Sequence, residues 1–197
     1  MNCSGQADGG LEDALTQLQQ IYTEIDVATR ELENRHAERL QCRRGCCDCC
    51  VDEITVFEIE AESIRRHYPE LLAEGRPHPP GACAFLDEAG ACRIYAHRPY
   101  VCRTQGLPLR WHETRPAGEV VELRDICPLN ETEEPIETLP PEACWEIGPF
   151  EARLARLQAE LDAGQLRRIS LRRMFGDERT APKFQDREPN RCKVMSK

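Results

Sequence analysis

The chain has 197 residues, of which 40% are hydrophobic, 31% charged and 6% aromatic, and its net charge is −9. This length suits one domain, but so few apolar side chains predict a modest core that needs additional support. The acidic balance argues against a nucleic-acid binder, which usually carries a basic field. No apolar run approaches the roughly 18 residues of a membrane span, so we expect neither nucleic acid nor membrane as a partner.

Residues 1–10 form a polar leader that we expect to be disordered. They contain no basic stretch followed by an apolar one, which argues against a secretory signal. We therefore expect a cytoplasmic protein. Because thiols stay reduced in the cytoplasm, the twelve cysteines of the chain indicate metal ligands or redox groups before they indicate disulfides.

A heptad stripe of apolar residues follows the leader, at Leu11, Leu15, Leu18, Tyr22, Ile25 and Leu32. This spacing predicts a long amphipathic helix over residues 11–40. The stripe is narrow, so the helix should pack against another helix. That partner could lie in the same chain or in a second copy, which leaves monomer and dimer both open.

Further helices are expected at residues 55–73 and from Phe150 to Gly164. Thr55 and Glu58 have the spacing of a capping box for the former helix. The latter repeats apolar residues at helical spacing and is predicted to pack on the N-terminal helix. Residues 118–124, GEVVELR, could form a short strand.

Two charged patterns are interpreted as solvent-exposed. Glu58, Glu60 and Glu62 fall on different faces of their predicted helix, which does not suit paired acid–base chemistry. The run RRISLRR at 167–173 is typical of a solvated basic face near a helix end.

The first cysteine block is CRRGCCDCC, residues 42–50. Two Cys-x-x-Cys pairs interleave in it, and this spacing lets two thiolates converge on one metal from a tight turn. Gly45 would relieve the backbone of that turn. Free cysteines can also serve as small apolar side chains in a core, but five in nine residues are too many for that role. Adjacent cysteines cannot form an unstrained disulfide with each other. The block therefore indicates a metal site.

The second block consists of Cys83, Cys92, Cys102 and Cys127, separated by eight, nine and twenty-four residues. Loops of these lengths can bring distant ligands to a shared site. Arg93, Arg98 and Arg103 neighbour these cysteines, and cations of this kind favour the thiolate form.

Together the two blocks resemble the YkgJ-type cysteine cluster family, also described as the CxxCxxCC zinc- or iron-chelating domain. The resemblance covers residues 42–103 and extends towards Cys127. It uses the following residues: Cys42, Cys46, Cys49, Cys50, Cys83, Phe85, Leu86, Cys92, Ile94, Tyr95, Arg98, Pro99, Cys102 and Arg103. Three residues separate Cys42 from Cys46, where the family name has two, and Cys47 is an additional thiol whose role as a ligand stays open.

What the resemblance implies is a metal- or iron–sulfur-binding module, mostly without an assigned activity. Flagellin lysine N-methylases share the cysteine cluster, so an enzyme is not excluded. The predicted metal ligands are Cys42, Cys46, Cys49, Cys50, Cys83, Cys92, Cys102 and Cys127. Zinc and an iron–sulfur cluster each take four thiolates, so these eight could serve two sites, or one site with spare thiols.

The other cysteines show no pattern. Cys144 lies beside Trp145 and is predicted to belong to the core, whereas Cys3 and Cys192 are interpreted as incidental. No histidine has a metal-ligand spacing, although His97 lies within the second block and could substitute for a thiol.

We therefore predict a mainly α-helical protein with an irregular, cysteine-rich centre organised by metal. Its segments are a leader (1–10), an amphipathic helix (11–40), a metal-binding domain (41–130), a connecting loop with a C-terminal helix (131–175) and an irregular tail (176–197).

Three functions remain open at this level: a metal-binding module that recognises a protein partner, an iron–sulfur redox or metal-handling protein, and a metal-dependent, protein-modifying enzyme. No nucleotide-binding or hydrolase motif is present, and no catalytic residue can be assigned. The enzyme alternative predicts a pocket beside the cysteines, lined by Arg98, Arg103 and Trp111.

Overall fold

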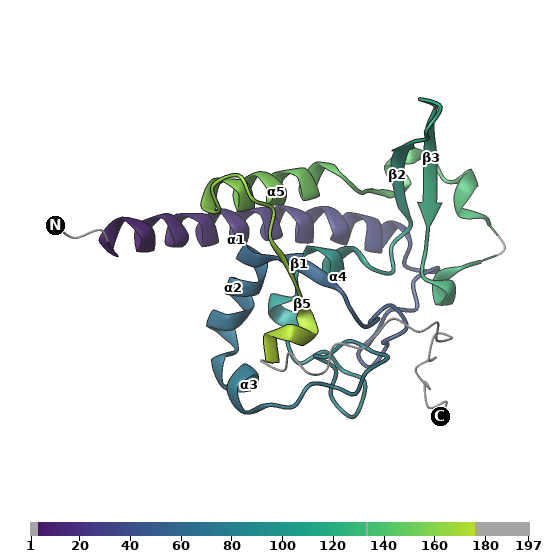
Figure 1. Cartoon of the computed structure of the whole chain (residues 1–197). Coiled ribbons are helices and arrows are strands. Elements are labelled where there is room, and N and C mark those ends of the chain that lie inside the picture. Colours follow the sequence, from purple (N-terminus) through teal and green to yellow (C-terminus); the bar gives the residue numbers. More distant parts are fainter. Residues whose placement is uncertain (1–3, 133, 176–197) are drawn as a thin grey trace.

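A computed structural model describes residues 4–132 and 134–175 of the chain (Figure 1). Its α-helices are α1 (Ser4–Arg35), α2 (Glu58–His67), α3 (Pro69–Glu74), α4 (Tyr100–Thr104) and α5 (Pro149–Leu161). Its strands are β1 (Thr55–Phe57), β2 (Leu109–Thr114), β3 (Val120–Asp125), β4 (Trp145–Glu146) and β5 (Arg168–Ser170). Single turns of 3-10 helix occur at Tyr95–His97, Pro128–Asn130, Ile136–Thr138, Pro141–Ala143 and Leu171–Phe175.

Helix α1 is the longest element, and α5 lies along it (Figure 1). The predicted stripe is its buried face: Leu18, Tyr22 and Ile25 pack into one apolar cluster with Leu154 and Leu157 of α5. Helix α1 starts at Ser4, within the segment expected to be a disordered leader, and ends before residue 40. The pairing with α5 accounts for the stripe within one chain.

The expectation of a mainly helical fold is wrong, because the chain also forms two small sheets. Strands β1 and β5 pair antiparallel, with Val56 opposite Ile169. Strands β2 and β3 form an antiparallel hairpin, and the short β4 adds to β2 in parallel, giving the order β3-β2-β4. These strands are short, and the pairs β1–β5 and β2–β4 join segments that are distant in the chain, so the sequence pattern does not reveal them. Only β3 coincides with a predicted strand.

The predicted helix over residues 55–73 is divided into three elements. Thr55 to Phe57 form β1, and α2 begins after Phe57, whose N–H donates to the Glu60 carboxylate; Thr55 and Glu58 therefore do not cap this helix. Pro69 then begins α3, since proline suits the first turn of a helix. Pairing of β1 with β5 supplies the hydrogen bonds that override the local helical signal.

Segment β1–α2 separates two hydrophobic clusters. Phe57 and Ile59 pack into the cluster formed by α1 and α5. Val56 and Ile64 pack into a second cluster, which also contains Phe85. We call the latter the lower cluster, and it underlies the cysteine-rich loops.

Glu60 lies between these clusters with only 3% of its surface exposed, which corrects its interpretation as a solvated side chain. Its Oε1 accepts hydrogen bonds from the Tyr22 hydroxyl (2.9 Å) and the Tyr100 backbone N–H (2.8 Å). Its Oε2 accepts one from the Phe57 N–H (3.1 Å). One carboxylate thus joins α1, α2 and α4. Burial raises the pKa of Glu60, although these hydrogen bonds oppose the rise.

No helix among the described residues has both the length and the apolar character that crossing a membrane requires. The predicted tail at 176–197 and residues 1–3 lie outside the described part. The division of the chain into five segments stays a prediction.

Glu60→Gln should destabilise the fold by about 1–3 kcal/mol. The glutamine NH₂ group cannot accept a hydrogen bond, so at least one of the three groups that donate to the Glu60 carboxylate would lose its acceptor. Because the folded state binds the Glu60 proton more tightly, stability contributed by Glu60 is greatest at acid pH and falls as pH rises above 4.5 through the folded pKa. The advantage of wild type over Glu60→Gln should shrink over that window. Urea unfolding of both proteins at several pH values measures this.

Glu62→Gln is the matched control on the same helix. Glu62 forms only partly exposed ion pairs with Arg65 and Arg66, so its loss should cost about 0–1 kcal/mol. Equal effects of the two substitutions would contradict the central position assigned to Glu60.

Candidate metal centre

The first cysteine block follows α1 as two successive turns. The Cys46 N–H donates to the Arg43 carbonyl, and the Cys50 N–H donates to the Cys47 carbonyl, both at 2.9 Å. Gly45 has φ of +84°, a left-handed value that glycine adopts without strain. The turns hold the block in a compact loop without helix or strand.

Asn130 connects the start of this loop to the last predicted ligand. It is fully buried, and its Oδ1 accepts a hydrogen bond from the Gln41 N–H (2.8 Å). Its Nδ2 donates to the Cys42 Sγ at 3.4 Å and to the Gly106 carbonyl at 2.7 Å. Its own N–H donates to the Cys127 carbonyl at 2.8 Å. Cys42 and Cys127, far apart in sequence, are therefore both hydrogen-bonded to the same residue, Cys42 through the Asn130 side chain and Cys127 through its backbone N–H.

Gly106 lies against the Cys42 thiol. A Cβ built on this glycine would be 2.6 Å from the Cys42 Sγ, and its φ is +93°. The close approach and the left-handed backbone both require glycine here. No sequence motif marked Gly106 or Asn130, because each acts on a cysteine distant in the chain.

The end of the first block joins the second block through the backbone. The Cys83 N–H donates to the Cys50 carbonyl at 2.8 Å. Cys92 forms an antiparallel bridge with Leu86, three residues after Cys83. Cys50, Cys83 and Cys92 all pack in or against the lower cluster. Cys102 lies on α4, the helix that the Glu60 carboxylate holds through Tyr100.

Arg172 anchors the segment before Cys83, which corrects its expected place on a solvated face. Its side chain is 3% exposed, and its Nε donates to Asp52 Oδ1 at 2.8 Å. Its Nη1 and Nη2 donate to the carbonyls of His78 and Ala82 at 2.7 and 2.8 Å. The 3-10 turn that follows β5 carries this guanidinium to the loop, and no local sequence pattern predicts that contact.

The eight predicted ligands are free thiols, with no disulfide among them. Burial raises the pKa of Cys42, Cys92, Cys102 and Cys127, and brings that of Cys83 to about 11. The adjacent thiols of Cys49 and Cys50 interact with each other, which lowers the pKa of Cys49 and raises that of Cys50. Soft sulfur donors in this number fit zinc or iron, and binding a metal would release their protons.

The neighbouring arginines do not all serve the cysteines. Arg98 donates to the Cys102 carbonyl at 3.2 Å, and the charges of Arg93 and Arg98 favour the thiolate of Cys92. Arg103 instead turns to α1, where it binds Asp26 at 2.6 Å and stacks over Tyr22. The enzyme alternative predicted that Arg103 lines a pocket beside the cysteines. Its ion pair with Asp26 places it elsewhere.

Within residues 4–132 and 134–175, no three cysteine, histidine or carboxylate side chains already have the geometry of metal ligands. A metal would therefore have to draw neighbouring thiols closer, as expected when binding and local folding are coupled. The His97 ring shares a hydrogen bond with the Tyr68 hydroxyl at 2.9 Å and stacks on His67. Cys144 is buried with Trp145 nearby, as predicted, while Cys3 and Cys192 lie outside the described residues.

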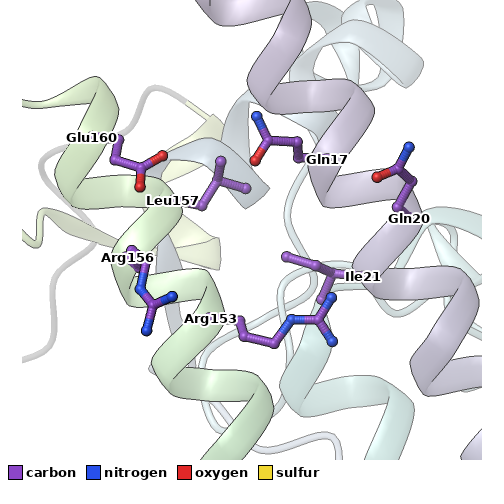
Figure 2. Close-up of a pocket in the computed structure, with 7 residues that line it drawn as sticks. All are labelled: Gln17, Gln20, Ile21, Arg153, Arg156, Leu157 and Glu160. Atoms are coloured by element: carbon purple, nitrogen blue, oxygen red, sulfur yellow. The ribbon is translucent and has the colours of Figure 1, made fainter.

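A cavity of about 170 Å³ lies between α1 and α5, lined by Ile21, Gln17 and Gln20 from α1 and by Arg153, Arg156, Leu157 and Glu160 from α5 (Figure 2). It is smaller than the roughly 300–1,000 Å³ of ordinary ligand pockets. None of its lining residues is a cysteine. This cavity does not supply the predicted pocket beside the thiols.

Residues 41–128 match a family model described as "CxxCxxCC: Putative zinc- or iron-chelating domain". The matched segment contains all eight predicted ligands. No curated protein and no solved structure gave a significant match to the chain. The comparisons thus agree with the resemblance of the two cysteine blocks and add no specific activity.

Gly106→Ala should weaken zinc binding by about 10-fold or more, the usual effect of disturbing a group that orients a metal ligand. The added methyl would displace the Cys42 thiol. Gly118→Ala is the matched control: Gly118 also has a left-handed φ, +83°, but a Cβ built on it would meet no atom within 4 Å. Both variants should lose about 1–2 kcal/mol of stability from backbone strain.

Competition with a chelator of known zinc affinity measures the difference between the variants. Equal zinc affinity in Gly106→Ala and Gly118→Ala would show that the position of Cys42 does not affect metal binding.

Proposed function

We propose that the protein binds zinc or iron through its clustered cysteine thiolates, because residues 41–128 match the model of the CxxCxxCC family. The proposed ligands are Cys42, Cys46, Cys49, Cys50, Cys83, Cys92, Cys102 and Cys127. The observation that carries the proposal is that all eight thiols are free, while hydrogen bonds join the segment of Cys42 to that of Cys127 and the segment of Cys50 to that of Cys83.

Buried polar side chains support this proposal, because they hold the cysteine-bearing segments in place without regular secondary structure. Asn130 joins the segments of Cys42 and Cys127. The Asp52–Arg172 pair secures the chain before Cys83. Cysteine-bearing segments held together by buried polar contacts favour a role for the thiols as metal ligands over a role as core side chains.

The first consequence of metal binding would be structural. Residues 75–99 contain one isolated bridge and one turn of 3-10 helix, so scattered turn hydrogen bonds hold them in place of a regular helix or sheet pattern. A zinc ion bound to thiolates would cross-link these loops, and structural zinc contributes on the order of 10 kcal/mol in small peptides. An iron–sulfur cluster would hold the same loops and add the capacity for electron transfer.

The alternative function is iron–sulfur redox chemistry or metal handling. The identity of the bound metal distinguishes it from a structural metal-binding module. For a protein-modifying enzyme, the described residues provide no favouring observation. Arg103 is paired with Asp26, and the cavity in Figure 2 lies between α1 and α5. Recognition of a protein partner by the metal-ordered surface stays part of the proposal, as does a cytoplasmic location.

Anaerobic purification followed by zinc, iron and acid-labile sulfide analysis tests the proposal. Wild type should contain zinc, or iron with matching sulfide and visible absorption, whereas Cys46→Ser/Cys50→Ser should contain far less. Removing the metal with a chelator should lower the melting temperature by on the order of 10 °C or more.

Cys144→Ala is the control, because Cys144 is a buried thiol that contacts Arg124 outside the cysteine loops. It should retain the wild-type metal content. A wild-type protein without metal that also fails to take up zinc or iron would refute the proposed function.

A further inference from the structure

We propose that a stacked pair of histidines, His67 and His97, is a pH-sensitive contact that holds the chain between Cys92 and Cys102 against helix α2 at neutral pH and releases it in acid. His67 is the last residue of α2, and His97 ends the 3-10 turn Tyr95–His97. Neither imidazole is among the proposed metal ligands, so the inference goes beyond the proposed function and does not depend on it.

The two imidazole rings face each other at close range. Their centroids are 3.6 Å apart and their planes differ by 22°. The Tyr68 hydroxyl lies 2.9 Å from the His97 Nδ1, and the Tyr68 ring meets the His97 ring edge-on with centroids 5.5 Å apart. Three neighbouring side chains thus join the end of α2 to the turn Tyr95–His97.

His67 can keep its position when it is protonated. Its Nδ1 lies 2.7 Å from the Ser63 carbonyl, which can only accept, so this nitrogen carries a hydrogen in either charge state. The carboxyl end of a helix also accommodates a positive charge. A proton gained at the Nε2 of His67 therefore places a charge directly against the His97 ring.

The surroundings of His97 oppose a second charge in the stack. Burial lowers the pKa of His97, and the positive charges of His67 and of Arg103, on α4, lower it further. The hydrogen bond to Tyr68 does not discriminate, because a hydroxyl can donate to neutral His97 or accept from the protonated ring. The close approach of the two rings therefore decides how the contact responds to acid.

No carboxylate among the described residues forms an ion pair with either histidine of the stack. The one described histidine within ion-pair distance of a carboxylate is His112, which faces Glu122 at 3.7 Å. Glu62, the last carboxylate of α2, is paired with Arg65 and Arg66. Repulsion between two protonated rings would therefore not be offset by a nearby negative charge.

The contact is consequently strongest at neutral pH. Because the folded state binds the His97 proton less tightly than the unfolded chain, the stability that neutral His97 contributes is complete above pH 6.5 and is lost as pH falls through the folded pKa. Acid should loosen the turn Tyr95–His97 and the chain that leads from it to Cys102.

Hydrogen exchange of the whole protein at about pH 7.5 and about pH 5.5 tests the inference. Results are compared as protection factors, which removes the intrinsic pH dependence of exchange. In wild type, protection of residues 94–102 should fall by about 5-fold at the lower pH, as expected for repulsion between two partly exposed charges. In His67→Phe, which keeps a ring against His97 but cannot be charged, protection should fall by less than about 2-fold.

A titration of the histidines by NMR gives an independent readout. His97 should take up its proton at a higher pH in His67→Phe than in wild type, because the opposing charge has been removed. His112→Phe is the matched control, since His112 lies on the hairpin of β2 and β3 and its side chain is 46% exposed. Its His97 should titrate as in wild type.

Loss of metal in acid would act on wild type and His67→Phe alike, so the difference between these proteins reports the stack. Equal loss of protection in both would overturn the inference, because the charge of His67 would then have no part in the release. A His97 that titrates at the same pH in both proteins would overturn it as well, and so would unchanged protection of wild type at the lower pH.

Discussion

The buried carboxylate of Glu60 is the interaction on which the arrangement of this protein depends. Removing a carboxylate from water is costly, and this one is retained because three donors from three elements satisfy it. Through Tyr22 and Tyr100 it fixes α2 relative to α1 and α4. Since α4 carries Cys102, the helical half of the molecule and the cysteine-rich half are oriented by the same side chain.

The cysteine-rich half is held by a different set of interactions. Its loops offer few partners for their own backbone groups, so buried side chains take that role. Asn130 satisfies one N–H and one carbonyl from separate segments, and Arg172 satisfies the carbonyls of His78 and Ala82. These contacts join the loops around Cys42 and Cys83, but among the described residues no three ligand-type side chains have metal-ligand geometry. Metal binding would complete the assembly that the polar contacts begin.

The lower cluster explains why such loops need not be wholly dependent on metal. Phe85, Leu86 and Ile94 are buried beneath the loops against Val56 and Ile64. The same cluster supports Cys50, Cys83 and Cys92, whereas Cys42 and Cys127 depend on Asn130 and Gly106. The two sets of thiols therefore differ in what holds them before any metal is bound.

The sequence by itself determined the features that local spacing encodes. The heptad stripe identified the buried face of α1, the return of that spacing at Phe150 identified α5, and the cysteine blocks identified the chelating segment that the family match covers. Only the tertiary structure decided the sheets, the burial of Glu60 and Arg172, and the contact between Cys42 and Asn130. The physical reason is distance along the chain: Glu60 meets Tyr22 and Tyr100, Arg172 meets Asp52, and Cys42 meets Asn130, and no local pattern records such pairs.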